Sequence, residues 1–170
     1  MIDSQTMIEL VRMRRRDLRR VMAIERVVFP EPWSHAVFAS ELALRKGRAY
    51  RIARRGKETV GYVGLMFVDE EAHVTTVAVA PEHQGKGFGT RIMAGAMRIA
   101  QENGARHVSL EVAVSNERAQ RIYKRFGFVP VGVRKGYYQA IGEDAYVMWA
   151  YDVDSAQYAA RLARIEGDIT

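Results

Sequence analysis

The sequence feature that most constrains the fold is a glycine-rich loop between a strand and a helix. Residues 72–80 alternate as a strand does, and residues 87–103 have the length and pattern of a helix. Between them, Gly85, Gly87 and Gly89 occupy alternate positions, which lets the backbone turn with its N–H groups pointing inward. Unpaired N–H donors and the helix dipole together make such a loop a phosphate-binding site. The alternative interpretation is a glycine-rich turn that binds no ligand.

This glycine pattern differs from two well-known nucleotide-binding motifs. It is not a Walker loop, because no Gly-Lys-Ser/Thr ends it at the required spacing. It is not the dinucleotide fingerprint, because the glycines are spaced differently and no acidic residue is placed to bind a ribose. Taken alone, the loop is a candidate anion site with no particular ligand.

The periodicity of the whole chain predicts one mixed α/β domain in which helices cover a central sheet. The length of 170 residues fits a single domain, which we expect to span residues 1–153, with residues 154–170 as a helical tail. The expected order is β-α-α-β-β-β-α-β-α-β-β, followed by a C-terminal helix. The predicted strands cover about residues 8–12, 50–53, 59–68, 72–80, 107–114, 129–133 and 145–151. The predicted helices cover about residues 17–29, 34–42, 87–103, 115–126 and 155–165.

The composition excludes several classes of protein. Cysteine is absent, so neither a disulfide nor an acyl-cysteine intermediate can form, and its absence is consistent with the cytoplasm. No apolar run is long enough to span a membrane, and the N-terminal segment lacks the apolar core of a secretory signal. The histidines lie far apart without paired metal-ligand spacing, so we interpret them as surface or strand residues and expect no metal site. They are His35, His73, His83 and His107.

Most of the net charge of +6 comes from one arginine-rich segment, without which the chain carries 20 basic and 19 acidic residues. One interpretation is a patch that meets RNA or a ribonucleoprotein. We favour the other interpretation, a strand end and a helix start with solvated arginines, because no aromatic residues alternate with the arginines. The segment contains Arg12, Arg14, Arg15, Arg16, Arg19 and Arg20, with Asp17 as its only acidic residue.

The loop and the strand before it resemble the coenzyme-binding segment of the GNAT acetyltransferases. Gln84, Gly87 and Gly89 form the pattern Gln-x-x-Gly-x-Gly of that family's pyrophosphate loop, and residues 77–81 are similar to its fourth strand. The resemblance covers about residues 8–151 and implies the GNAT fold, with acetyl-coenzyme A as cosubstrate and no metal. It also implies that the pantetheine arm pairs with the strand backbone and that a backbone N–H near the strand end polarises the acetyl carbonyl. The implied coenzyme-binding residues are Val77, Ala78, Val79, Gln84, Gly85, Lys86, Gly87, Phe88, Gly89 and Thr90.

Residues 110–128 carry the candidate acid and base. Strand alternation turns Glu111 away from the apolar face, which by itself indicates a solvated carboxylate. Tyr123 has helical spacing with apolar neighbours, which by itself indicates core packing. The order Leu-Glu-Val, Ser-Asn, Ala-x-x-x-Tyr and Gly-Phe, however, is similar to the bacterial ribosomal-protein alanine N-acetyltransferases, the RimI group of the GNAT family. That resemblance implies Glu111 as general base, Tyr123 as general acid and Asn116 as a coenzyme contact. Ala113 departs from the pattern, since the group often has arginine there.

Two aromatic segments resemble the acceptor-binding loops of the same group. Residues 29–34, Phe-Pro-Glu-Pro-Trp-Ser, resemble its turn of that pattern. Residues 136–138 and 143–148 resemble its closing loop and last strand. The resemblance implies that the two segments flank an incoming peptide, as two aromatic-rich turns of a groove do. The alternative is that Trp33 staples the chain onto the next helix and that the tyrosines pack within a strand. The implied acceptor-binding residues are Phe29, Pro30, Trp33, Tyr137 and Tyr138.

These residues and the resemblance predict an enzyme that acetylates the N-terminal α-amino group of a protein, in particular a small-subunit ribosomal protein. An α-amino group has a pKa of about 7.7–8.0, so much of it is protonated at neutral pH and a base is needed. Without cysteine, direct attack in a ternary complex is simpler than a ping-pong route. Three alternatives remain open: an enzyme that acetylates lysine side chains or small amines, a non-catalytic acetyl-coenzyme A sensor, and an RNA-binding module. Retention of both Glu111 and Tyr123 argues against the sensor.

Overall fold

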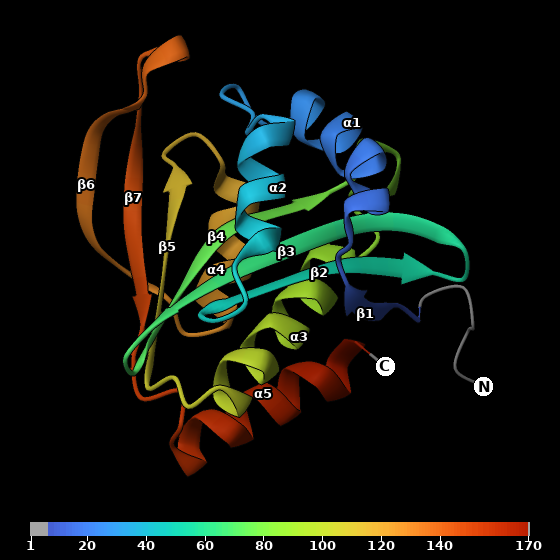
Figure 1. Cartoon of the computed structure of the whole chain (residues 1–170). Helices are drawn as coiled ribbons and strands as arrows, with labels where there is room; N and C mark the ends of the chain where they lie inside the picture. The colour runs from blue at the N-terminus through green and yellow to red at the C-terminus, as the bar shows by residue number, and fades with distance from the viewer. Residues whose placement is uncertain (1–6, 170) are drawn as a thin grey trace.

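The computed structural model describes residues 7–169, which form a central sheet with helices on both faces (Figure 1). Within these residues the strands are β1 (Glu9–Arg12), β2 (Arg48–Arg55), β3 (Glu58–Val68), β4 (Glu71–Val79), β5 (His107–Ala113), β6 (Val129–Tyr138) and β7 (Glu143–Ala150). The α-helices are α1 (Leu18–Val28), α2 (His35–Ala43), α3 (Phe88–Glu102), α4 (Glu117–Arg125) and α5 (Ala156–Ile169). The predicted order of strands and helices is confirmed. The outer limits predicted for the domain and tail, residues 1 and 170, lie outside the described residues.

One seven-stranded sheet in the order β1-β2-β3-β4-β5-β7-β6 organises the described residues. β4 and β5 run parallel, and all other neighbouring strands run antiparallel. The parallel pairing is short, from Glu71 opposite His107 to His73 opposite Ser109, although both strands continue well beyond these residues. The two strands therefore diverge after His73 and leave an opening in the middle of the sheet.

Each face of the sheet has its own hydrophobic core. Along β4 and β5 every second residue is buried, as strand periodicity requires. One core packs α3, α4 and α5 against one face, and the other packs α1 and α2 against the opposite face (Figure 1). The opening between β4 and β5 is therefore framed by rigid, covered strands.

The C-terminal helix α5 is part of the core beside α3. Its residues Tyr158, Leu162 and Ile165 are buried, and the Tyr158 hydroxyl donates to the carbonyl of Phe126 at 2.6 Å. The segment predicted as a tail therefore packs against the domain over its described length. No helix among residues 7–169 combines the length and the apolar character that crossing a membrane would require.

Two local predictions were wrong. Asn116, and not Ser115, caps α4, because its Oδ1 accepts the N–H of Ala119 at 3.1 Å. β6 does not end at Val133 but continues to Tyr138, because its backbone pairing with β7 resumes after the apolar alternation stops. In both cases a backbone hydrogen bond, which the side-chain pattern does not reveal, decides where the element begins or ends.

Candidate active site

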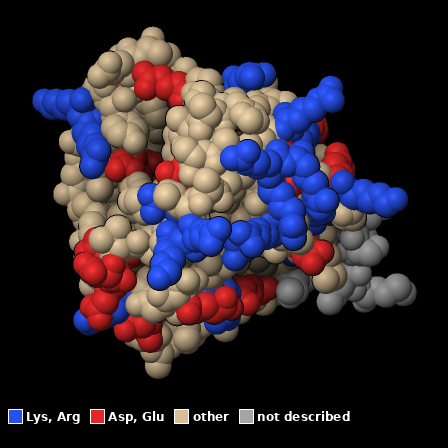
Figure 2. Space-filling model, viewed as in Figure 1, with Lys and Arg blue, Asp and Glu red and all other residues tan. Residues whose placement is uncertain are grey.

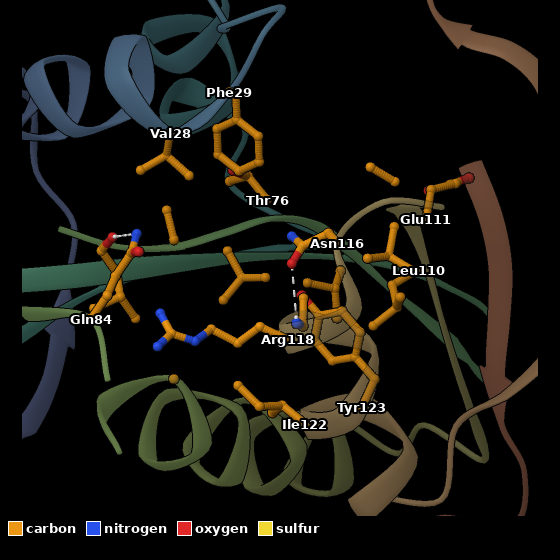
Figure 3. Close-up of a pocket in the computed structure, with 18 of the residues that line it drawn as sticks. Val28, Phe29, Thr76, Gln84, Leu110, Glu111, Asn116, Arg118, Ile122 and Tyr123 are labelled. Carbon is orange, nitrogen blue, oxygen red and sulfur yellow. Dashed lines mark hydrogen bonds between the residues drawn. The ribbon is translucent and has the colours of Figure 1, made fainter. Parts of the chain in front are cut away.

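The opening between β4 and β5 leads into a cavity of about 1310 Å³ (Figure 3). The free end of β4, the glycine-rich loop, β5, the start of α4 and both aromatic segments line it. The predicted site residues in this lining are Phe29, Pro30, Trp33, Val77, Ala78, Val79, Gln84, Gly85, Gly87, Gly89, Thr90, Glu111, Asn116, Tyr123, Tyr137 and Tyr138. The fold thus brings together residues that are far apart in the sequence.

The glycine-rich loop has the backbone geometry of an anion-binding site. Gly85 and Gly87 have φ values of 77° and 82°, in the left-handed region that side chains rarely adopt. Gly87 precedes the first residue of α3, and no side chain among the described residues caps this helix, so its first N–H groups remain for a ligand. Gln84 fastens the loop to β4, because its Nε2 donates to the carbonyl of Val79 at 3.1 Å (Figure 3). The loop is therefore preformed for an anionic group.

Two predicted coenzyme-binding residues lie outside the lining, and several unpredicted residues, Arg118 among them, lie within it. The Phe88 ring is buried in the core, and Lys86 Nζ donates to the carbonyl of Glu82 at 3.0 Å. Arg118 of α4 lines the cavity, and its guanidinium lies 3.3 Å from the position that a Cβ on Gly85 would occupy. Arg118 therefore supplies the cation beside the loop. Its only signal in the sequence is its place in the first turn of the helix that follows the candidate base.

Glu111 faces the cavity from β5 and is largely buried, so the solvated interpretation was wrong. Its side chain is 10% exposed, and its carboxylate lies 2.9 Å from His73 Nε2 and 3.6 Å from Arg134. Burial raises the pKa of Glu111, but the hydrogen bond and charge of His73 and the charge of Arg134 outweigh burial and hold the pKa below its ordinary value. The other ring nitrogen of His73 lies 2.9 Å from Ser109 Oγ, which fixes the imidazole. Glu111 is therefore an ionised carboxylate held in one orientation.

His73 and Arg134 contact the candidate base Glu111, and the sequence predicted neither of them as a site residue. His73 reaches Glu111 because β4 and β5 pair with His73 directly opposite Ser109, two residues before Glu111. Arg134 reaches it because β7 pairs with both β5 and β6 and holds β6 beside the site. Both contacts depend on the pairing of distant strands, for which the sequence has no local signal.

Tyr123 belongs to the core and to the cavity at once. Its ring is 8% exposed and packs on Phe128, with ring centroids 6.0 Å apart, so core packing is correct for the ring. The residue also lines the cavity (Figure 3), and no hydrogen bond to its hydroxyl occurs among residues 7–169. Burial, and then the nearby Tyr138, raises the pKa of Tyr123, so the hydroxyl keeps its proton at neutral pH.

The two aromatic segments form the outer walls of the cavity. The rings of Tyr137 and Tyr138, at the end of β6, meet edge to face with centroids 5.0 Å apart. Burial, and then the neighbouring Tyr137, raises the pKa of Tyr138 to about 12, so this hydroxyl is also a donor. A hydrogen bond links the two walls, because Glu31 Oε1 accepts the N–H of Ala140 at 2.6 Å. The two segments therefore flank one groove of the cavity.

Trp33 is a staple onto α2, and it also lies in the cavity lining, where contact with an acceptor stays a prediction. It lines the cavity, and its ring packs on Phe38 in the first turns of α2 with centroids 5.1 Å apart. Ser34 caps the same helix, since its Oγ accepts the N–H of Val37 at 3.2 Å. The ring therefore acts as a hydrophobic staple that also fixes one wall of the groove.

His83 contradicts the interpretation of all four histidines as surface or strand residues. It lies in a short 3₁₀ turn after β4, is 4% exposed, and its Nε2 lies 2.8 Å from Glu58 Oε1. Within the described residues, His83, Glu58 and Glu82 form a group of three residues of the kinds that bind metals, and their ligand atoms lie within 4.8 Å of one another. Arg20 and Arg55 already pair with the two carboxylates, which disfavours a cation at this place.

A sheet that splits above a phosphate-binding loop, with a carboxylate and a phenol beside the split, has the architecture of a coenzyme A-dependent acetyltransferase. The chain belongs to the acetyltransferase (GNAT) family, whose family model matches residues 18–128. It is therefore an N-acetyltransferase that uses acetyl-coenzyme A as its acetyl donor.

Several known proteins are similar to this chain over most of its length. N-alpha-acetyltransferase RimI of Mycobacterium tuberculosis is 36% identical over 140 residues, covering 79% of this chain and 86% of the relative. A Bacillus subtilis protein, provisionally named a ribosomal protein bS18-alanine N-acetyltransferase, is 39% identical over 137 residues, covering 81% and 91%. The solved structure of the ribosomal-protein-S18-alanine N-acetyltransferase from Escherichia coli matches with a TM-score of 0.78 at 26% identity, covering 86% of this chain and 94% of that one.

Proposed function

We propose that this acetyltransferase acts on the N-terminal α-amino group of proteins, and in particular of a small-subunit ribosomal protein. The observation that carries the proposal is Glu111, an oriented carboxylate where the coenzyme cavity meets a groove with two aromatic walls. The names of the B. subtilis and E. coli relatives, which refer to alanine N-acetylation of ribosomal protein bS18, support the choice of acceptor. Such an acceptor would place the reaction in the cytoplasm.

The residues around the loop fit acetyl-coenzyme A. The N–H groups at the start of α3 and the Arg118 guanidinium lie beside the same volume and would bind the pyrophosphate. Beyond His73, the edge of β4 that faces β5 has no strand partner among residues 7–169, so its backbone can pair with the amides of an extended arm. A backbone N–H near Val79 would then polarise the acetyl carbonyl. Asn116 contributes its amide N–H₂, since its Oδ1 already caps α4.

Glu111 would accept the proton of the attacking amine. An α-amino group with a pKa of about 7.7–8.0 is largely protonated at neutral pH, and only the free amine attacks. Once the nitrogen bonds to the acetyl carbon it becomes strongly acidic, so even a carboxylate with a lowered pKa takes its proton, directly or through one water. His73 and Arg134 keep the carboxylate ionised, and the 3.6 Å contact with Arg134 leaves that oxygen available.

Tyr123 would donate a proton to the leaving sulfur. As the C–S bond breaks, the sulfur gains negative charge and needs a donor. The Tyr123 hydroxyl still carries its proton, because burial raises its pKa, and no described residue competes for it. The amine nitrogen thus loses one proton to Glu111, the leaving thiolate gains one from Tyr123 and becomes the thiol, and proton exchange with solvent restores both residues.

A panel of acceptors tests this proposal against the alternatives. With peptides that have a free N-terminal alanine, the enzyme should release coenzyme A from acetyl-coenzyme A. It should release none with a polyamine, or with the same peptides carrying a blocked α-amino group and an internal lysine. Turnover only with lysine or the polyamine would identify a side-chain or small-amine acetyltransferase. Binding of acetyl-coenzyme A with no turnover would identify a sensor domain. Mass spectrometry of protein N-termini from cells with and without the gene would then identify the acceptor.

We propose in addition that the arginine-rich segment makes a weak contact with RNA, as on a ribosome. Arg12, Arg14, Arg15, Arg16 and Arg19 are exposed, and none forms an ion pair within the described part of the chain. Figure 2 shows that basic side chains gather in a band across one face of the molecule. Affinity for RNA should fall linearly with salt concentration on logarithmic axes. Unchanged affinity after Arg15→Glu and Arg16→Glu would leave these side chains as solvated arginines.

A further inference from the structure

A second buried carboxylate, Glu25 of α1, lines the cavity and has no part in the proposed reaction. Glu25 is 2% exposed, and a carboxylate in such a place is costly unless hydrogen bonds satisfy it. Its Oε1 accepts the backbone N–H of Trp33 at 3.1 Å, and its Oε2 accepts the hydroxyl of Tyr62. It forms no ion pair with any cation in residues 7–169. Both oxygens are therefore occupied by uncharged donors.

Glu25 holds both ends of the turn that forms one wall of the groove. Its backbone carbonyl accepts the N–H of Phe29 at 3.0 Å, which is the last helical hydrogen bond of α1 and does not depend on the side chain. Its side chain accepts the N–H of Trp33, and this second contact is the one specific to Glu25. Pro30 and Pro32 lie between these two points and have no N–H, so the turn has few backbone donors of its own to fix it. One residue thus brackets the segment.

The contact of the Glu25 carboxylate with the turn of residues 29–34, here called the brace, is connected to the sheet by aromatic contacts. The Trp33 ring packs on Phe38 of α2, and Phe38 packs edge-on against Tyr62 of β3 with centroids 6.1 Å apart. Tyr62 is fully buried, and its hydroxyl returns to Glu25, which closes a ring of contacts from α1 through the turn and α2 to β3. On its outer side the turn reaches the β6–β7 hairpin through Glu31. The brace therefore supports one wall directly and the other wall indirectly.

We propose that Glu25 is a positioning residue that holds the turn of residues 29–34 against the sheet and thereby sets the affinity for the acceptor peptide. The proposal rests on the proposed function, in which this turn contacts the acceptor. A buried carboxylate that only fills space can be replaced by an apolar side chain of similar volume at little cost in stability. A carboxylate that positions the turn cannot be replaced in this way without loss of acceptor affinity. The substitution Glu25→Met separates the two roles.

Steady-state kinetics provide the first test. Glu25→Met should raise KM for the acceptor peptide by about tenfold or more, the size expected for a lost hydrogen bond to a charged group, and leave KM for acetyl-coenzyme A unchanged. Glu25→Gln should restore most of the affinity, because its amide oxygen still accepts from Trp33 and the Tyr62 hydroxyl can rotate to accept from its nitrogen. Glu41→Met is the matched control. It breaks a similar contact with the Tyr50 hydroxyl, 3.0 Å long, and also an ion pair with Arg48. Neither contact involves the turn, so both KM values should stay unchanged.

Tryptophan fluorescence tests the brace without any acceptor. The chain has two tryptophans, so Trp149→Phe leaves Trp33 as the single fluorophore. In that background Glu25→Met should make Trp33 more accessible to acrylamide quenching, and Glu25→Gln should not. If Glu25→Met does not fold, Tyr62→Phe should also raise the acrylamide quenching of Trp33 and the acceptor KM, but by smaller amounts.

Two outcomes would overturn the proposal. One is that quenching of Trp33 and the acceptor KM both stay unchanged in Glu25→Met. The other is that both KM values rise together while quenching stays the same, which is the behaviour of a residue that only supports the core. Because quenching needs no substrate, it still reports on the brace if peptides prove not to be acceptors, so the two failures are distinguishable.

Discussion

Replacing Glu111 by glutamine removes a charge and a proton acceptor while the size of the side chain stays almost the same. The side chain is 10% exposed and lies 2.9 Å from His73, and the amide oxygen can still accept from that imidazole, so packing and coenzyme binding should change little. The loss of general-base catalysis should lower turnover by about 10²–10⁴-fold. This range corresponds to about 3–5 kcal/mol in the activation barrier.

The pH dependence of this loss separates a base from a binding group. Above about pH 9 most α-amino groups are already neutral, and hydroxide can take the proton from the newly bonded nitrogen in place of Glu111. The gap in turnover between mutant and wild type should therefore narrow there. Glu111 itself should not shape the wild-type profile near neutrality, because its pKa is held below the ordinary value. The assay is release of coenzyme A at saturating acetyl-coenzyme A, with Glu117→Gln as control, since Glu117 is exposed and lies outside the cavity lining.

Two results would refute the assignment of Glu111 as base. A gap of constant size at every pH would show that the carboxylate binds the charge of the acceptor or holds the geometry of the site. The absence of any gap would show that the carboxylate takes no part in the reaction. Either result would also remove the main chemical reason for proposing an α-amine as the acceptor.

Four further changes test the cavity and the fold. Gly87→Val should abolish the rise in melting temperature that acetyl-coenzyme A produces, since valine is strained at a φ of 82°. The control Gly56→Val, at a φ of 61° in the β2–β3 turn, should lower stability but keep the rise. An intact rise in Gly87→Val would place the phosphate site elsewhere. Tyr123→Phe should lower turnover and keep coenzyme affinity within a few-fold, and unaltered turnover would leave its hydroxyl as a packing feature only. Leu162→Ala should lower the free energy of unfolding by about 2–5 kcal/mol in a denaturant titration, because the side chain is fully buried, and a change within about 0.5 kcal/mol would make α5 a detachable tail. The pKa of Glu111 is lower in the folded protein than in the unfolded chain, where it is taken as 4.5, so its ionised form stabilises the fold at pH values above 4.5. This contribution is lost as the pH falls through the folded pKa, so acid should destabilise the wild type more than Glu111→Gln.

Features encoded over a few residues could be predicted from the sequence. The order of strands and helices, the glycine-rich loop and the Ser34 cap follow from periodicity, backbone freedom and capping chemistry, all of which act locally. Two predictions failed locally. The α4 cap depended on which of two adjacent side chains accepts a backbone N–H, and the end of β6 depended on where its backbone pairing with β7 stops. Periodicity does not carry that information.

The surroundings of the candidate site residues could not be predicted in the same way. The resemblance placed Glu111 and Tyr123 in the cavity, but His73, Arg134 and Arg118 reach it through strand pairing and helix packing across the whole domain. The side-chain pattern of His73 is that of any half-buried strand residue. Its contact with Glu111 appears only when the register of β4 against β5 is known.

Two carboxylates in one cavity have environments that suit them to opposite roles. Glu111 faces His73 and Arg134, which overcome burial and hold its pKa below the ordinary value, whereas burial raises the pKa of Glu25, which contacts only uncharged donors. The partners of Glu111 stabilise its charge but leave one oxygen with a contact of 3.6 Å, so that oxygen can take a new proton. Both oxygens of Glu25 already accept hydrogen bonds in the interior, so a new proton could arrive only by breaking one of them. The work of accepting a proton therefore falls to Glu111, and Glu25 can influence the reaction only through the turn that it holds.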